Sequence, residues 1–125
     1  MTPPAFSQTR TADGPLLFIS GQIPLDAQGK PVDGGIREQA RVVFQQLSAI
    51  LDAEDYSLAD VVKLTYFLTD MADLPQLREV IGEFFEDPKP ASTLVQVSAL
   101  IDPKFLVEIE AIAARRTDQA KSRQS

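Results

Sequence analysis

The segment 106–113, near the end of the chain, alternates with a period of two. Val107, Ile109, Ala111 and Ala113 would share one face of a strand. The other face would carry two glutamates between two apolar side chains: Leu106, Glu108, Glu110 and Ile112. This pattern fits two alternatives. The glutamates can be ordinary surface residues on a half-exposed strand, or at least one of them can lie at the mouth of a cleft. The alternation predicts a strand with one buried face.

Two amphipathic helices are expected to cover one face of the sheet. The first follows the glycine turn at 33–35, and its apolar residues recur at helical spacing: Ile36, Ala40, Val43, Leu47, Ile50 and Leu51. The second is expected to begin at Asp73, where Gln76 completes a capping-box pattern and Pro75 suits the first turn. It should end near Phe85.

The remaining strands are predicted from alternation and turn residues. Segments 6–9 and 16–20 are expected to form a hairpin, and further strands are expected over 61–69, 93–98 and 106–114. In the segment 61–69 the core face is assigned to Val62, Leu64, Tyr66 and Leu68. Two helices cover one face only, so the other face meets water or another subunit. Four apolar residues on mixed faces favour an oligomer: Phe67, Leu94, Leu106 and Ile112.

Composition limits the chemistry of the chain. Its 125 residues fit a single domain over 1–116, followed by a polar tail, 117–125, that we expect to be disordered. It contains no histidine and no cysteine. Serine–histidine and cysteine–histidine nucleophile systems are therefore excluded, as are disulfides. Any reaction must use carboxylates, lysine, hydroxyls or main-chain groups, and we expect no metal and no other cofactor.

Charge and hydropathy limit the partners. The formal net charge is −6, whereas neutralising nucleic-acid phosphates requires a clustered excess of lysine and arginine. We expect no nucleic-acid partner. The chain has no apolar run of a length that spans a membrane, and its first residues lack the basic and apolar parts of a secretory signal. We therefore expect a cytoplasmic protein that does not bind membranes.

Four short segments, in order and at suitable separations, resemble the Rid family (reactive intermediate deaminases, also called YjgF). They are 19–24, 60–63, 90–95 and 107–113. The resemblance extends from Phe6 to about Arg116. It implies an α/β (α+β) chorismate-mutase-like subunit with a six-stranded mixed sheet and two helices on one face. It also implies a homotrimer with clefts for a small-molecule metabolite at the subunit interfaces. Deaminase members hydrolyse 2-imino or 2-enamino acids to 2-oxo acids and ammonia.

The resemblance assigns roles to individual residues. Glu108 matches the catalytic acidic residue that positions the attacking water, and Ser20 and Gly21 match a substrate-binding loop. Ser92 stands where deaminases of the family have the arginine that binds the substrate carboxylate. Phe6 stands where many members have tyrosine. The remaining implied substrate-binding residues are Thr93 and Leu94.

The serine at position 92 leaves two functions open. One hydroxyl offers a single donor and no charge, so a bidentate contact worth on the order of 2 to 4 kcal/mol is lost. The chain is then either a hydrolytic deaminase of an imine or enamine with a non-standard substrate, or a non-catalytic metabolite-binding or interaction protein that keeps the trimer. Four cations could replace the arginine, although each also fits an ordinary surface position: Arg10, Lys63, Lys89 and Lys104.

Overall fold

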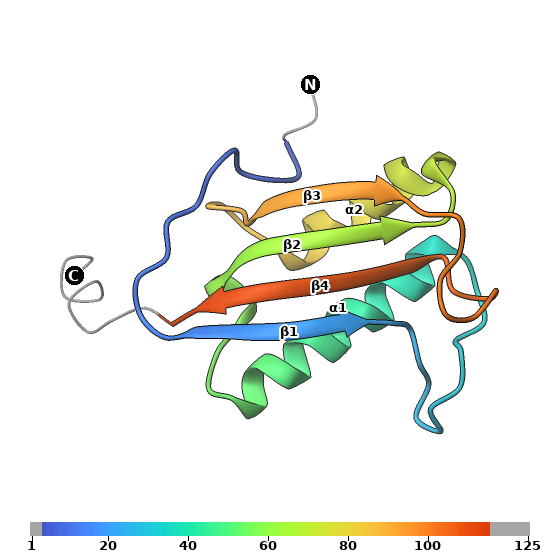
Figure 1. Ribbon diagram of the computed structural model, residues 1–125, viewed down its shortest axis with the longest axis horizontal. Coiled ribbons are helices and arrows are strands. Elements are labelled where there is room, and N and C mark those ends of the chain that lie inside the picture. Colours follow the sequence, from blue (N-terminus) through green and yellow to red (C-terminus); the bar gives the residue numbers. More distant parts are fainter. Residues whose placement is uncertain (1–3, 116–125) are drawn as a thin grey trace.

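The computed structural model describes residues 4–115, so the tail predicted over 117–125 lies outside the described residues. The elements in chain order are β1 (Leu16–Gln22), α1 (Ile36–Ala53), η1 (Leu58–Asp60), β2 (Val61–Leu68), η2 (Met71–Asp73), α2 (Leu74–Phe84), β3 (Ala91–Gln96) and β4 (Val107–Ala114). The strands form one mixed sheet in the order β1-β4-β2-β3 (Figure 1). Strand β4 is antiparallel to both of its neighbours, whereas β2 and β3 are parallel.

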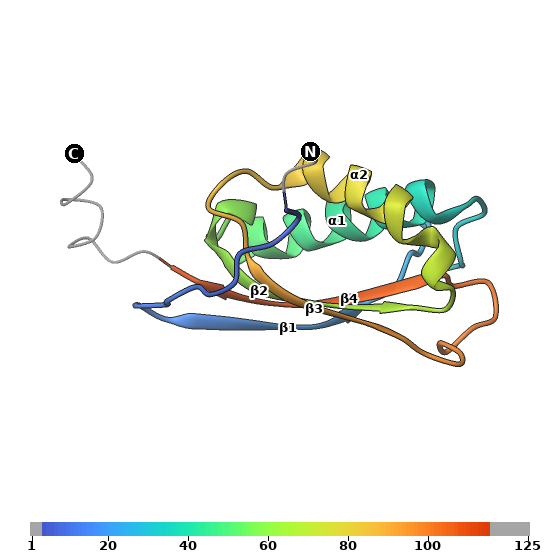
Figure 2. The ribbon, with the colours of Figure 1, turned by 90° about the horizontal axis from the view of Figure 1, so that it is seen from above.

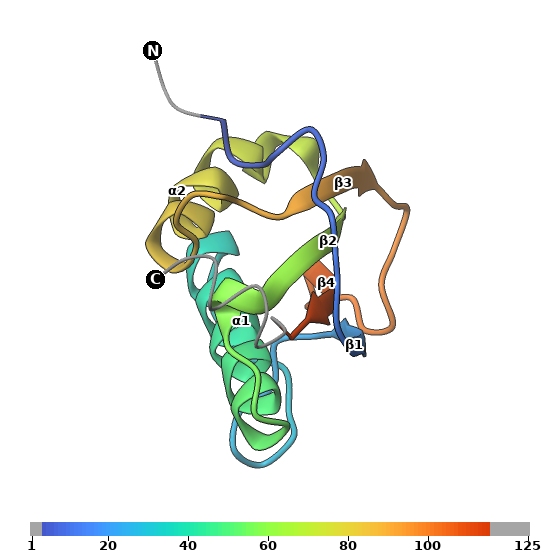
Figure 3. The same cartoon turned by 90° about the vertical axis from the view of Figure 1, so that its left-hand side faces the viewer.

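The molecule has two layers. Both helices pack on one face of the sheet, as the sequence predicted, and no described segment covers the other, which we call the open face (Figures 2 and 3). Neither helix has the length and apolarity of a transmembrane helix in the part of the chain that the structure describes. The layered arrangement leaves one side of every strand available for a site or for another subunit.

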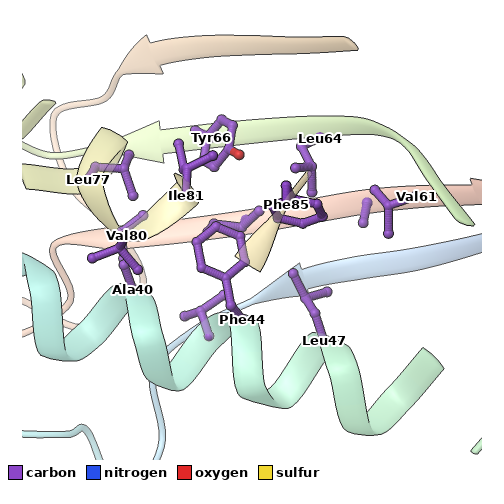
Figure 4. Packing of buried hydrophobic residues seen from close by; sticks show 14 of the residues in the cluster. Ala40, Phe44, Leu47, Val61, Leu64, Tyr66, Leu77, Val80, Ile81 and Phe85 are labelled. Atoms are coloured by element: carbon purple, nitrogen blue, oxygen red, sulfur yellow. The ribbon is translucent and has the colours of Figure 1, made fainter. Parts of the chain in front are cut away.

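The core lies between the sheet and the helices. The predicted buried face of β4 is confirmed, because Val107, Ile109, Ala111 and Ala113 are all buried. The ring of Phe44 from α1 is fully buried and lies 5.5 Å from the ring of Phe85 (Figure 4). Burying large aromatic and aliphatic side chains in this way is the main source of stability for a two-layer domain.

A buried glutamine ties α1 to the start of β4. Gln39 Oε1 accepts a hydrogen bond of 2.8 Å from the main-chain N–H of Leu106, and Gln39 Nε2 donates to the carbonyl of Lys104 at 2.9 Å. Gln39 is the only buried polar or charged side chain among residues 4–115. Because a buried amide must find partners, this side chain fixes the position of β4 relative to α1.

The start of α2 differs from the prediction. The side chain of Asp73 makes no cap hydrogen bond, so the predicted capping box is wrong. Instead, the Asp70 side chain accepts a hydrogen bond of 2.9 Å from the main-chain N–H of Ala72 and begins the short turn η2. The side-chain cap therefore lies at the start of η2, one turn before α2. Pro75 occupies the first turn of α2, as predicted.

The face assignment of β2 was wrong at its first residues. Val61 is buried and Val62 is half-buried, although the alternation placed Val62 in the core. The register of β2 against β4 shifts between Val61 and Lys63. A one-residue irregularity exchanges the two faces of a strand, which local alternation does not reveal.

The predicted hairpin was also wrong. Ser7 forms a parallel bridge with Ala91 and donates a hydrogen bond of 3.0 Å to the carbonyl of Pro90, whereas β1 pairs with β4. The first residues therefore lie along the β3 edge of the sheet, and the chain then crosses to β1 at the opposite edge (Figure 1).

Residues 4–115 form four strands rather than the six implied by the resemblance. Two further pairings are isolated bridges, Ser7 with Ala91 and Leu25 with Pro31. Proline lacks the N–H that a longer ladder needs, and the segment 6–9 has one large apolar residue, Phe6.

Two of the four residues assigned to subunit contacts also contact the core. Leu94 and Leu106 are partly buried against the core cluster, and their contact with another subunit stays a prediction. Leu94 lies opposite Tyr66 of β2, whose side chain is buried under the helices. Phe67 and Ile112 lie in register with Glu108 and Lys63, on the open face.

Candidate functional site

The carboxylate of Glu108 packs against the main chain of Gly21. A Cβ atom on residue 21 would overlap Glu108 Oε2 and lie 2.9 Å from Glu108 Cδ. The register of β1 against β4 shifts between Ile19 and Gln22, and Gly21 lies within this irregularity. A side chain at position 21 would therefore force the Glu108 carboxylate to move away from this position.

The turn that follows β1 is held by α1. Gln46 accepts a hydrogen bond of 3.1 Å from the main-chain N–H of Leu25 and donates one of 2.9 Å to the carbonyl of Ile23. Both ends of the Glu108–Gly21 contact are thus fixed to α1, one through Gln46 and the other through Gln39 at the start of β4. Such support keeps a functional carboxylate in one place.

A shallow pocket of about 220 Å³ lies beside this contact on the open face. Its lining residues are Phe18, Ile19, Ser20, Lys63, Thr65, Glu110, Ala111 and Ile112. Lys63 Nζ donates a hydrogen bond of 2.7 Å to Thr93 Oγ1. Four of the predicted site residues therefore belong to the open face, namely Ser20, Gly21, Thr93 and Glu108.

The other three predicted residues line a second pocket of about 350 Å³ between β3 and α2, which we call the β3–α2 pocket. Its lining residues are Ala5, Phe6, Met71, Leu74, Arg78, Ile81, Ser92 and Leu94. Ser92 lies opposite Leu64 of β2, whose side chain is in the core, so its hydroxyl is on the helix side of the sheet. The bridge of Ser7 to Ala91 holds Phe6 over this pocket.

One chain does not bring all seven predicted site residues together. Glu108 is on the open face, opposite Phe67, whereas Ser92 and Leu94 are on the helix face. The sheet separates the two groups. A single site that contains both requires the open face of one chain to meet the β3–α2 pocket of another.

Of the four candidate cations, Lys63 alone lines one of these two pockets. Lys63 lines the open-face pocket, whereas Arg10 donates hydrogen bonds to the carbonyls of Pro88 and Lys89 at 2.9 and 3.2 Å. Lys89 donates to the carbonyl of Pro4 at 2.9 Å, and Lys104 lines neither pocket. None of the four lines the pocket that contains Ser92.

Arg78, which was not among the predicted site residues, lines the β3–α2 pocket with Ser92. A signal was present, because Arg78 is four residues after Leu74 and three before Ile81, on the apolar stripe of α2. A charged residue on an apolar stripe indicates a boundary between core and surface. The sequence did not show that β3 would place Ser92 on the same wall.

Two titratable groups near these pockets have shifted pKa values. Burial raises the pKa of the Tyr66 phenol, so this side chain stays neutral in the core. Burial also raises the pKa of the Asp73 carboxyl, and the negative charge of Asp70 raises it further. Within residues 4–115 no three acidic side chains are grouped to hold a metal ion.

Comparison with known proteins shows the family of the chain. The family model described as Endoribonuclease L-PSP matches residues 2–115. The chain belongs to the Rid (YjgF) family. The RutC family protein PH0854 from Pyrococcus horikoshii is 50% identical over 102 residues, which are 80% of this chain and 79% of PH0854.

Two further Rid relatives come from bacteria. TdcF from Escherichia coli, whose name includes the words "reactive intermediate deaminase", is 38% identical over 106 residues, 82% of this chain and 81% of TdcF. A crystal structure of TdcF with bound serine has a TM-score of 0.73 to this chain. The Rid family protein YyfB from Yersinia pestis is 32% identical to this chain, with a TM-score of 0.79. The alignment covers 89% of this chain and 87% of the YyfB chain.

Proposed function

We propose that this protein is a cytoplasmic Rid-type homotrimer that hydrolyses an imine or enamine metabolite, with Glu108 as its catalytic residue. The packing of the Glu108 carboxylate against the main chain of Gly21, on an uncovered sheet face, carries the proposal. A carboxylate held in this way can order a water molecule over a bound substrate. Membership of the family that includes TdcF supports the same reaction class.

The division of the site between two faces supports assembly. The open face exposes apolar side chains, of which Phe18 is 70% accessible in the single chain. Covering this face with a second chain would bury them and exclude water from Glu108. The β3–α2 pocket of the neighbouring chain would then complete the cleft with Phe6, Ser92 and Leu94.

The proposed reaction needs one water molecule and no redox step. Water adds to the carbon of the C=N bond while Glu108 accepts one of its protons, and the nitrogen takes up a proton to give a carbinolamine. The proton that Glu108 accepted is the one delivered to the nitrogen, so the carboxylate is regenerated. The hydroxyl proton of the carbinolamine then passes to the nitrogen as the C–N bond breaks, and a carbonyl compound and ammonia leave. Ser20 lines the open-face pocket and Gly21 contacts Glu108, which supports the proposal that these two residues bind the polar end of the substrate.

The alternative function is metabolite binding without catalysis. The apolar lining of the β3–α2 pocket, which includes Phe6, Met71 and Leu74, favours this alternative because such a pocket binds well without chemistry. The presence of Arg78 in the same pocket favours the deaminase, because it supplies a cation near Ser92. The net charge of −6 does not favour a nuclease, although the family model carries that name.

Imine hydrolysis can be measured directly. An amino-acid oxidase generates 2-imino acids, and the loss of their semicarbazones reports hydrolysis by the parent chain. Glu108→Gln keeps the size of the side chain and should abolish turnover, whereas Glu86→Gln removes an exposed carboxylate outside both pockets and should not. Equal turnover in the parent and in Glu108→Gln would contradict the proposed role of Glu108. No turnover in the parent would favour the binding protein.

A further inference from the structure

Arg78 differs from the other described arginines in having no partner for its guanidinium group. Arg10 and Arg115 donate hydrogen bonds to main-chain carbonyls, and Arg37 and Arg41 donate to glutamates of α2. Among residues 4–115, Arg78 makes no side-chain hydrogen bond and no ion pair. Five donors are therefore free to bind a ligand.

Arg78 lines the β3–α2 pocket, and its side chain is exposed in the single chain. It lies between Leu74 and Ile81 on one side of α2, and all three line the pocket. Ser92 and Leu94 of β3 form the facing wall. The long side chain of arginine can pack its methylene groups on these apolar neighbours and present the guanidinium at the pocket wall.

The pocket favours an anion. Arg78 is the only charged residue among its described lining residues, and Ser92 adds a hydroxyl. Asp73 of η2 and Asp70, which caps η2, are close to Arg78 in sequence but do not line the pocket. A guanidinium beside apolar side chains binds a carboxylate more strongly than it would in open water.

We propose that Arg78 binds the carboxylate of the ligand in the β3–α2 pocket and so replaces, from α2, the guanidinium that Ser92 of β3 cannot provide. This inference rests on the proposed function, because it takes the β3–α2 pocket to be part of the ligand site. It does not require catalysis, because it concerns binding of the ligand and not its hydrolysis. It specifies an apolar carboxylate as the ligand class. The anionic group is then held from the helix side of the cleft, which explains why a serine is tolerated on the strand.

Binding of a defined probe tests this proposal. Calorimetric titration would compare 2-oxobutanoate, a small 2-oxo acid, with uncharged 2-oxobutanamide on the parent chain. We expect the parent to prefer the acid by roughly tenfold to a hundredfold, as for a charge-assisted contact. Arg78→Gln should lose this preference, whereas Arg41→Gln, which removes an exposed guanidinium outside the pocket, should keep it.

A second variant separates lost charge from lost structure. Because residues 78 and 92 line one pocket, the double variant Arg78→Gln/Ser92→Arg should regain the preference for the acid. Unfolding temperatures of all variants would confirm that each is folded. Failure of the double variant to regain binding, an unchanged preference in Arg78→Gln, or no preference in the parent would each overturn the proposal.

The outcome of this binding experiment can be told apart from the outcome of the imine-hydrolysis assay. Binding that depends on Arg78, in a chain without imine hydrolysis, would support this inference and contradict the deaminase. Hydrolysis that depends on Glu108, with an acid preference unaffected by Arg78→Gln, would support the deaminase and overturn this inference.

Discussion

The carboxylate of Glu108 lies against the main chain of Gly21, so a side chain at residue 21 would displace this carboxylate. The contact joins an irregularity in the edge strand β1 to the central strand β4. It places the proposed catalytic residue on the open face at a position that the two strands define together.

Gly21→Ala should therefore damage the site more than the fold. The added methyl group displaces Glu108, and a displacement of about 1 Å can reduce turnover on the order of a hundredfold. The free energy of unfolding should fall by less than about 1 kcal/mol, because the clash is with the flexible end of a partly exposed side chain. Imine hydrolysis and urea unfolding would measure the two effects.

Gly82→Ala is the matched control for that change. No atom lies within 4 Å of a Cβ atom built on Gly82, which is inside α2. Alanine should raise the free energy of unfolding by roughly 0.5 to 1 kcal/mol and leave turnover unchanged. A loss of turnover as large as that of Gly21→Ala would contradict the steric account.

Gln39→Ala should lower the stability of the chain. The change leaves the N–H of Leu106 and the carbonyl of Lys104 without their buried partner, at a cost of about 1 to 3 kcal/mol. Gln45→Ala, at an exposed position of α1, should change the free energy of unfolding by less than about 0.5 kcal/mol. Urea unfolding of both variants compares them, and equal effects would mean that the buried bonds add no stability.

Phe18→Asp should weaken assembly without unfolding the chain. The side chain is exposed in one subunit, but in the proposed trimer it would be covered by a neighbour. Sedimentation velocity should show a shift toward the monomer. Ala49→Asp adds the same charge to an exposed position of α1 and should leave the trimer intact. An unaffected trimer in Phe18→Asp would place the subunit interface elsewhere.

Acid should weaken the ion pair that joins the two helices. Arg41 Nε and Nη2 donate to the two carboxylate oxygens of Glu83 at 2.9 and 2.7 Å, and the hydrogen bond from Arg41 lowers the pKa of Glu83. The unfolded chain therefore binds this proton more readily, so the pair stabilises the fold above the ordinary pKa of 4.5. Its contribution is lost as the pH falls through the lowered value.

The unfolding free energy of the parent should consequently fall more steeply with acid than that of Arg41→Gln. The two curves should converge at low pH, where Glu83 is protonated in both chains. Lys30→Gln makes the same charge change at an exposed position outside this pair and should keep the slope of the parent. Identical slopes in the parent and in Arg41→Gln would contradict the role of the pair.

Local patterns predicted most elements of the fold because each is encoded within a few residues. The alternation in β4 and the apolar stripe of α1 gave the correct buried faces. The errors arose where the structure of a segment depends on the strand with which it pairs and not on its own sequence. Val61 turned inward because β2 pairs irregularly with β4, and Ser7 paired with Ala91 at the far edge of the sheet.

The site was predictable only in part for the same reason. Glu108 and Ser20 came from a resemblance between short segments, whereas their separation from Ser92 depends on which strand face each residue occupies. Arg78 is far from those segments in sequence and joins Ser92 only through the packing of α2 beside β3. Spacing along one chain does not contain that information.

The central claim is that the site is completed by two copies of the chain, and subunit mixing tests it most directly. Glu108→Gln chains, expected to be inactive, and Arg78→Gln chains, expected to bind the substrate weakly, would be unfolded together, refolded at equal amounts and assayed for imine hydrolysis at a substrate concentration where neither variant alone turns over measurably, with mixed oligomers verified by native mass spectrometry. Random assembly should restore about one quarter of the parent activity, because about one site in four receives both unmodified residues. Mixed oligomers without activity would mean that one chain supplies both residues, which would contradict the account.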